Sequence, residues 1–362
     1  MNTNKLTSLL FITFLIFSCE SKPGEYVCTP CDLTCDSETF HEPGTCPHCN
    51  MPLVKVSELE KLNNLVVNQI DIQEGSGAFL IEGGKGKESK SIKVFYHKPI
   101  NFSEDSKILL VIPGAGRNGD SYRDAWIPES EKFNVLILSP MYAEDEYLFE
   151  DYHLGGIMTG LNLEEAAEAV PNTNQVKLNE EIFNFTINPD RETWLFEDFD
   201  RIFELAKEAT GSAQSTYDIF GHSAGGQILH RYTILKPYSK ADQIIAGNSG
   251  FFTMPDTTLN LPFGIKGLEV SKEDLKASFQ QNLVLLLGEN DNETETGGTM
   301  LKSPTADLQG NGRLAKGQYF YEKSKKLAEQ LGYEFNWKLV TVPNVGHDQE
   351  LMGDAAAKIL YE

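Results

Sequence analysis

The sequence is short of cysteine, of basic residues and of long apolar runs. All six cysteines lie within the first 49 residues, so no disulfide can hold the rest of the chain together. Lys and Arg number 31 against 53 Asp and Glu, and the net charge of 31 − 53 = −22 excludes the phosphate-neutralising surface of a nucleic-acid-binding protein. Beyond the N-terminal segment, no run approaches the roughly 18–20 apolar residues that a membrane-spanning helix needs.

What is present is the composition of an ordinary globular protein. The 362 residues are 40% hydrophobic and 10% aromatic, and the 30 Gly and 16 Pro show no collagen-like bias. This length exceeds the roughly 250–300 residues at which a single hydrophobic core stops growing. The sequence therefore predicts one large domain with smaller appendages.

The N-terminus contains one short apolar run, at residues 9–17, which Lys5 precedes. At about 1.5 Å of rise per residue, this run cannot cross a hydrocarbon core of about 30 Å. Its length and position are typical of the apolar region of a secretory signal peptide. We therefore expect the chain to be exported.

The residues at the end of that run, Leu15-Ile16-Phe17-Ser18-Cys19, resemble the lipobox of bacterial lipoproteins. The resemblance implies that residues 1–18 are a lipoprotein signal peptide and that Cys19 carries the lipid. Residues 19–25 would then form a lipidated linker. The expected location is the bacterial cell envelope, with the chain attached to a membrane through its lipid.

Two C-x-x-C pairs follow, separated by a spacer of 14 residues. The pairs are Cys28/Cys31 and Cys46/Cys49, and further donors close by are Cys35, His41 and His48. Four converging thiolates favour zinc or another soft metal ion such as Cu(I). A module of about 30 residues needs a metal or disulfides to stay folded. Export favours disulfides, but lipidation of Cys19 would leave five cysteines, an odd number that favours metal.

The two ends of this segment carry a family resemblance. Tyr26-x-Cys28 and Pro43-Gly44-x-Cys46-Pro47-x-Cys49-x-Met51 are similar to the small heavy-metal-binding domain found beside copper-exporting pumps and efflux adaptors. The resemblance implies a separate metal-binding module over residues 26–56.

From about residue 66, short apolar runs alternate with longer helical patterns. This alternation predicts an α/β domain with a mostly parallel, doubly wound sheet covered on both faces. The expected strands are Ile92–His97, Ile108–Ile112, Val135–Leu138, Thr216–Phe220, Gln243–Ala246, Leu283–Leu287 and Trp337–Val342. The expected helices are Ser121–Lys132, Glu197–Thr210, Ala224–Leu235, Gly317–Gly332 and Gln349–Leu360.

The alternation also suggests boundaries within the main body. Residues 57–89 are expected to be a linker and lead-in to the sheet, and residues 90–362 the α/β domain. The stretch 143–193 breaks the pattern, because it is acidic and has few strand signals. We interpret it as an insertion at the carboxyl side of the sheet, over the site.

An expected strand runs directly into Gly221-His222-Ser223-Ala224-Gly225-Gly226, and a helix is expected to follow. G-x-S-x-G between a strand and a helix is typical of a nucleophile elbow, a sharp turn that exposes the serine hydroxyl above the sheet. The serine also lies at a helix N-terminus, where the N–H of Ala224 is free to bind a developing oxyanion. Ser223 is therefore the candidate nucleophile.

A serine nucleophile needs a base, and the base needs an acid that fixes its tautomer. His347 is the candidate base, because it follows the last expected strand at the carboxyl edge of the sheet. The acid should follow a strand between the two, where Asp291 is the first choice and Glu289 the alternative. His153, in the insertion, could line the substrate cleft.

The chain order of Ser223, Asp291 and His347 resembles that of the α/β-hydrolase fold, over roughly residues 90–360. Within that superfamily, residues 112–126 look most like the esterase and polyhydroxyalkanoate-depolymerase-like branch. The resemblance implies a second oxyanion donor in the loop Pro113–Gly116, with Ala115 first and Gly116 next.

These residues predict a lipid-anchored serine hydrolase, and a carboxylesterase acting on a small-molecule or polymer ester in particular. Such a mechanism runs through an acyl-enzyme and needs no cofactor. A serine peptidase on the same fold remains open, because triad and oxyanion hole serve amides as well. A third reading is an envelope metal-binding protein whose hydrolase body is inactive.

Overall fold

The computed structural model describes residues 26–28, 38–48, 53–56 and 65–362. The chain divides into two compact units, residues 1–64 and residues 65–362. No helix within the described ranges is long and apolar enough to cross a bilayer.

The described part of the first unit contains a small antiparallel sheet in the order β2-β1-β3. Its strands are β1 (Tyr26–Cys28), β2 (Thr39–Phe40) and β3 (Leu53–Lys55). Cys28 and Cys46 are buried, and Phe40 and Leu53 pack against them. Among the residues described, no group of three or more His, Cys, Asp or Glu could hold a metal ion. Cys19, Cys31 and Cys49 lie outside the described residues, so the metal site and the lipid anchor stay predictions.

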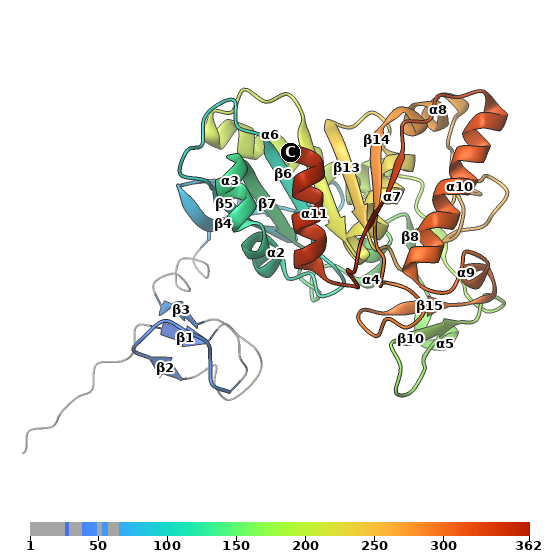
Figure 1. Ribbon diagram of the computed structural model, residues 1–362, viewed down its shortest axis with the longest axis horizontal. Coiled ribbons are helices and arrows are strands. Elements are labelled where there is room, and N and C mark those ends of the chain that lie inside the picture. The colour runs from blue at the N-terminus through green and yellow to red at the C-terminus, as the bar shows by residue number, and fades with distance from the viewer. Residues whose placement is uncertain (1–25, 29–37, 49–52, 57–64) are drawn as a thin grey trace, which may run out of the picture. The chain divides into compact units, whose positions relative to one another are not determined.

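The second unit is built on an eight-stranded sheet in the order β16-β14-β13-β12-β6-β7-β5-β4 (Figure 1). Pairing is parallel throughout, except that β5 is antiparallel to both of its neighbours. The strands are β4 (Gly75–Glu82), β5 (Ser91–Lys98), β6 (Ile108–Ile112), β7 (Leu136–Met141), β12 (Tyr217–His222), β13 (Ala241–Gly247), β14 (Asn282–Gly288) and β16 (Lys338–Val342).

Alternate residues of the inner strands feed two separate cores, one on each face of the sheet. In β6, Leu110 belongs to the larger core, whereas Leu109 and Val111 belong to the smaller one. Helices that bury their apolar faces in the larger core are α6 (Phe196–Thr210), α7 (Ala224–Leu235), α8 (Lys272–Gln280) and α10 (Arg313–Leu331). Those that cover the smaller core are α2 (Gly119–Ala125), α3 (Ile127–Phe133) and α11 (Gln349–Tyr361).

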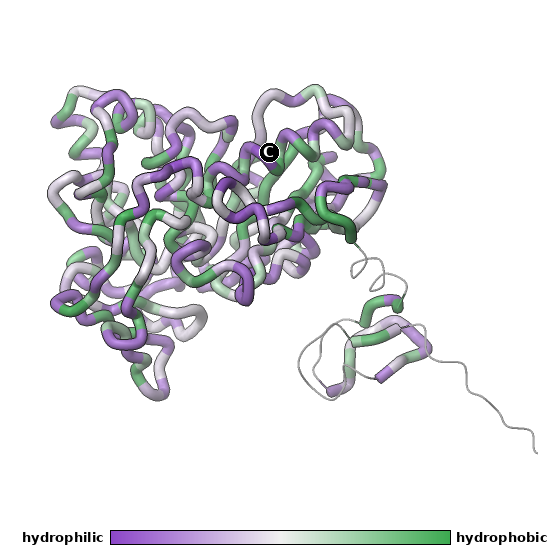
Figure 2. Tube along the Cα trace, turned by 180° about the vertical axis from the view of Figure 1, so that it is seen from behind, coloured by the Kyte–Doolittle hydropathy of each residue, from purple (hydrophilic) through white to green (hydrophobic). Residues whose placement is uncertain are grey.

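The hydropathy of the chain follows this layering. Hydrophobic stretches run through the interior of the larger unit, and hydrophilic ones lie along its outer turns (Figure 2). The doubly wound α/β architecture expected from the sequence is therefore present.

Several elements differ from the expectations. The region expected to be a linker, residues 57–89, contains the strand β4, whose Gly75-Ser76-Gly77 start lacks the apolar pattern of a strand. The helix α8 was also not expected. The helix expected over residues 121–132 is broken at Trp126, because Pro128 cannot continue a helix from the preceding turn and instead lies in the first turn of α3. The helix α10 begins at Arg313, four residues before the expected start.

The stretch 143–193 contains more strand than its sequence suggested. Its elements are α4 (Phe149–His153), β8 (Met158–Thr159), α5 (Leu163–Ala166), β9 (Ala167–Ala169), β10 (Gln175–Leu178) and β11 (Thr186–Ile187). The strand β10 pairs with β9 and with β15 (Met300–Lys302), which lies beyond β14 in the chain. Strands this short carry too few residues for an alternation pattern, which explains why the sequence did not reveal them.

Asp218, in β12, is a buried carboxyl group that makes the stability of the fold depend on pH. One of its carboxylate oxygens accepts a hydrogen bond from Tyr361 (3.2 Å), and the other has no partner among the described residues. Burial raises the pKa of Asp218 from 3.8 to about 6. The folded state therefore prefers the protonated acid, and this contribution to stability is complete below about pH 4 and lost as the pH rises through about 6.

We expect Asp218→Asn to stabilise the protein at pH 8 by up to about 3 kcal/mol, because the amide is never charged. The gain should vanish at pH 4. Thermal unfolding at the two pH values measures it, with Asp354→Asn on the exposed side of α11 as the control. A variant that is less stable than the parent at pH 8 would contradict this account.

Candidate active site

Ser223 lies at the sharp turn between β12 and α7. Its backbone has φ of 59° and ψ of −115°, a left-handed conformation that a non-glycine residue adopts only under strain. The neighbouring glycines are required by close packing. A Cβ on Gly221 would lie 2.6 Å from the carbonyl carbon of Gly225, and one on Gly225 would collide with the carbonyl oxygen of Ile112. The sequence motif therefore folds as the elbow that its glycines indicate.

Ser223, His347 and Asp291 form one continuous chain of hydrogen bonds. The Ser223 Oγ lies 2.9 Å from Nε2 of His347, and Nδ1 of His347 lies 2.7 Å from Oδ2 of Asp291. Because ionised carboxylates only accept hydrogen bonds, we assign the imidazole proton to Nδ1, which leaves Nε2 free to accept from the serine. The structure thus brings together the three side chains that the sequence selected from three separate loops.

Glu289, the alternative acid, lies elsewhere. Its carboxylate accepts a hydrogen bond from the backbone N–H of Asn344 (2.8 Å), so it holds the loop before His347 and not the imidazole ring. Asp291 is fully buried, whereas Glu289 is exposed. The geometry therefore distinguishes the two carboxylates that the sequence left open.

The second oxygen of Asp291 is bound by Arg313, a residue that the sequence analysis missed. Nη1 of Arg313 donates to Oδ1 of Asp291 at 2.7 Å, and both side chains are almost completely buried. Nη2 donates to the carbonyl oxygens of Gly297 (3.0 Å) and Thr299 (3.1 Å). Arg313 is the first residue of α10, and nothing in its spacing from Ser223 points to the site. The one nearby sequence feature is Gly312, which precedes α10 and has a positive φ of 88°.

The segment 295–299 packs directly against His347. The Glu295 carboxylate accepts from the backbone N–H groups of His347 (2.9 Å) and Gly297 (2.7 Å). Gly298 has a positive φ of 61°, and a Cβ there would lie 2.5 Å from Nε2 of His347. Asn174, from the insertion, donates to the carbonyl oxygen of Gly298 (3.0 Å). The insertion therefore reaches the segment beside the imidazole.

The two segments that carry the expected oxyanion donors both adjoin Ser223. Ala224 is the first residue of α7, where a backbone N–H has no partner within the helix. The loop of Ala115 lies against the serine, since a Cβ on Gly114 would be 3.5 Å from Cβ of Ser223. The hydroxyl of Tyr152 donates to the carbonyl oxygen of Pro113 (2.6 Å) and fixes the start of that loop.

His222 and His153 stay neutral. The His222 ring lies 4.5 Å from the ring of His347, and burial, with the nearby His347 and Arg313, holds its pKa well below the usual range. His153 stacks on Phe149 at 4.2 Å. Burial, with two nearby arginines, lowers the pKa of His153 to about 3. Neither ring can serve as a cation at neutral pH.

Buried cations without carboxylate partners lie near the insertion and α7. Arg231 donates to Oγ1 of Thr253 (2.9 Å) and to the carbonyl oxygen of His153 (2.7 Å), and burial lowers its pKa to about 9. Lys316 donates to the carbonyl oxygen of Leu301 (2.9 Å), and burial lowers its pKa to about 8. Within the part of the chain that the structure describes, neither forms an ion pair. An acidic protein thus keeps a local excess of positive charge in its interior.

Two solved structures are similar to the chain over the larger unit. Poly(aspartic acid) hydrolase-1 from Sphingomonas sp. KT-1 has 34% sequence identity to this chain and superposes with a TM-score of 0.68. The match covers 80% of this chain and 100% of that one. LpqC, a poly(3-hydroxybutyrate) depolymerase from Bordetella parapertussis, shares 24% identity with a TM-score of 0.67, over 80% of this chain and 91% of that one. No protein-family model and no curated protein matches the sequence.

We expect Arg313→Met to slow phosphonylation of Ser223 by a fluorophosphonate at least about tenfold. Without the guanidinium, Oδ1 of Asp291 is buried and unpaired, and a positive charge is lost from beside the Asp291–His347 pair. The acid limb of the pH–rate profile should then move to higher pH, and Arg313→Lys should restore part of both effects.

The control is Arg201→Met, which removes an ion pair of the same length with Asp198 (2.7 Å), more exposed and away from the elbow. It should leave the profile unchanged. A slower Arg313→Met enzyme with an unmoved acid limb would show that Arg313 only supports the fold.

Proposed function

We propose that this chain, which belongs to the family of α/β serine hydrolases that includes poly(aspartic acid) hydrolase-1, is a carboxylesterase acting through a Ser223 acyl-enzyme. The observation that carries the proposal is the unbroken chain from Oγ of Ser223 through His347 to Asp291, at 2.9 and 2.7 Å. The substrate is a carboxylic ester, of a small molecule or of a polymer.

The proposed reaction follows from the positions of the atoms. Nε2 of His347 accepts the hydroxyl proton while Oγ of Ser223 attacks the ester carbonyl carbon. The N–H groups of Ala224 and Ala115 stabilise the oxyanion, and Asp291 stabilises the imidazolium. The imidazolium then protonates the leaving alcohol, and water repeats the cycle on the acyl-enzyme. This chemistry needs no cofactor.

We expect a fluorophosphonate to add once to the wild-type chain and not to Ser223→Ala. His347→Ala should react about 10³-fold more slowly or worse, because no base removes the serine proton. Intact-mass analysis measures the adduct, and peptide mapping places it. A folded wild-type chain that stays unlabelled would rule out an assembled triad and favour the metal-binding role of the N-terminal module.

Amide hydrolysis of an anionic polymer is the second candidate function. The family relationship favours it, because the Sphingomonas relative is named as a hydrolase of poly(aspartic acid), a polyamide with a carboxylate on every unit.

Under this second candidate, the wild type should release new amino groups from poly(aspartic acid), whereas Ser223→Ala should release none. The wild type should also be assayed on a neutral ester such as p-nitrophenyl butyrate. An enzyme that cleaves only the ester would exclude the amide candidate and leave the carboxylesterase proposal intact.

The N-terminal segment adds two proposals that do not depend on the hydrolase. We propose that Cys19 carries a lipid which attaches the chain to a membrane of the bacterial cell envelope. We also propose that Cys28, Cys31, Cys46 and Cys49 bind zinc or another soft metal ion, with disulfides as the alternative. The resemblances to the lipobox and to the heavy-metal-binding domain support these proposals.

Mass analysis of the chain expressed with its own N-terminus should show cleavage before Cys19 and added acyl mass, both absent from Cys19→Ala. Elemental analysis should find one metal ion per chain, lost in Cys46→Ser. A metal-free chain in which only one of the remaining five cysteines reacts as a thiol would instead establish disulfides.

A further inference from the structure

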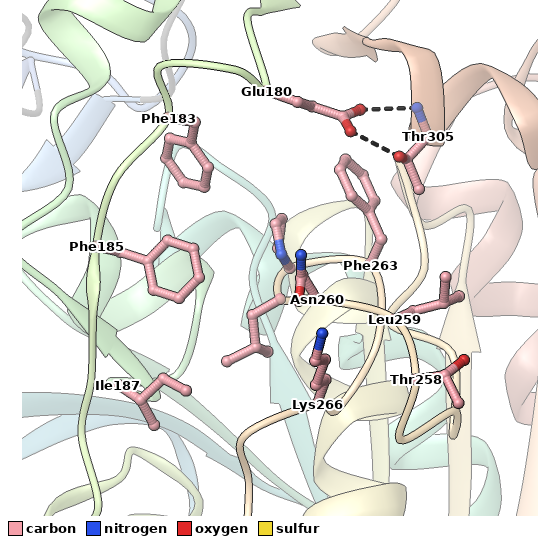
Figure 3. Close-up of a pocket in the computed structure, with 12 residues that line it drawn as sticks. Glu180, Phe183, Phe185, Ile187, Thr258, Leu259, Asn260, Phe263, Lys266 and Thr305 are labelled. Carbon is pink, nitrogen blue, oxygen red and sulfur yellow. Dashed lines mark hydrogen bonds between the residues drawn. The ribbon is translucent and has the colours of Figure 1, made fainter.

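A second concave site lies apart from the triad. Its volume is about 350 Å³, within the range of about 300–1,000 Å³ that small-molecule pockets occupy. Two segments form it, residues 180–187 of the insertion and residues 258–266 beyond β13, and Thr305 of α9 (Pro304–Leu308) closes one end (Figure 3). None of its lining residues belongs to the triad or to the oxyanion loop.

Apolar side chains stand on two facing sides of this pocket, and the rest of its lining is polar. Phe183, Phe185 and Ile187 stand on the insertion side, across from Leu259 and Phe263 (Figure 3). The rings of Phe183 and Phe185 lie 5.5 Å apart in a tilted arrangement. Such walls fit an aromatic ring or an alkyl chain, which buries apolar surface on entry.

The wall formed by Phe263 is held in place. Its ring packs edge-to-face on Phe251 at 5.6 Å, and its carbonyl oxygen accepts from the backbone N–H of Met254 (2.8 Å). The hydroxyl of Thr253 donates to the carbonyl oxygen of Pro262 (2.6 Å). The segment therefore presents its apolar side chains without having to order them on binding.

The acidic group of the pocket is already occupied. Both oxygens of Glu180 accept from Thr305, one from its N–H (2.7 Å) and one from its hydroxyl (2.6 Å). Burial alone would raise the pKa of Glu180, but hydrogen bonds from Ser303 and Thr305 outweigh it and lower the pKa. Glu180 therefore links the insertion to α9 through its two hydrogen bonds. Its oxygens are not available to recognise a cationic ligand.

The basic group is available. Lys266 is exposed, and its ammonium forms no ion pair with any residue that the structure describes. Its backbone is fixed, because its N–H donates to the carbonyl oxygen of Leu259 (2.9 Å). Gly267 follows with a positive φ of 87°, and a Cβ there would lie 2.7 Å from Cδ1 of Ile187. That glycine lets the lysine segment approach the apolar wall, where its side chain lines the cavity (Figure 3).

We propose that this pocket binds a small carboxylate with an aromatic or alkyl body. The body lies between the phenylalanine walls, and the carboxylate pairs with Lys266. Apolar burial supplies the affinity, and the ion pair at the rim selects acids over alcohols. Acids of this kind belong to the product class of the proposed ester hydrolysis, but the site binds them independently of that reaction.

The test compares 4-phenylbutyrate with 4-phenylbutan-1-ol, which share a body and differ in charge. Isothermal titration calorimetry on the full chain should show saturable binding of the carboxylate, at least about tenfold tighter than the alcohol. Lys266→Met should weaken the carboxylate at least about tenfold and leave the alcohol unchanged. Phe185→Ala should weaken both, and Lys276→Met, on the exposed side of α8, should affect neither.

A second experiment determines whether the carboxylate binds in this pocket or at the triad. Chain labelled on Ser223 by a fluorophosphonate should bind 4-phenylbutyrate as tightly as unlabelled chain. Loss of binding after labelling would put the carboxylate at the triad and overturn the proposal, as would equal affinities of wild type and Lys266→Met or no binding up to about 10 mM. If Ser223 cannot be labelled, the hydrolase proposal fails while the Lys266 comparison still decides this one.

Discussion

The buried carboxylate of Asp291 is the group on which the rest of the site depends. One of its oxygens faces the imidazole of His347 and the other faces Arg313, at 2.7 Å each. A carboxylate removed from water is costly unless both oxygens are hydrogen-bonded, and here a cation satisfies one of them permanently. The other oxygen therefore holds the imidazole of His347 in a single orientation. Arg313 also binds the carbonyl oxygens of Gly297 and Thr299, so the same cation positions the segment that packs against the imidazole of His347.

The fold delivers these groups to one place because the sheet is parallel. The carboxyl ends of β12, β14 and β16 lie along the same edge, and Ser223, Asp291 and His347 each follow one of them. Apolar strands, buried on both faces, set the sheet, and two layers of helices hold it rigid. The insertion then contributes through Asn174 and through one wall of the second pocket, so it connects both sites to the same scaffold.

The sequence alone predicted the position of a residue wherever that position depends on neighbouring residues in the chain. The glycines around Ser223, the apolar runs of the inner strands and the position of His347 after the last strand each predicted their place in the fold. The sequence did not predict the contacts of residues whose partners are far away along the chain. Arg313 is 22 residues from Asp291, and Glu180 meets Thr305 across 125 residues, so no spacing rule could pair them. The strands of the insertion are two to four residues long, and their pairing is set by neighbours that the sequence does not identify.

The most direct test of this account is the position of the imidazole proton on His347, measured by ¹⁵N NMR at neutral pH. The signal is assigned by its loss in His347→Gln. If Asp291 fixes the ring as described, wild-type His347 carries its proton on Nδ1, and Asp291→Asn moves it to Nε2 because the amide donates where the carboxylate accepted. A proton on Nε2 of the wild-type ring, or an even mixture of the two tautomers, would contradict the account, since Nε2 could then not accept the proton of Ser223.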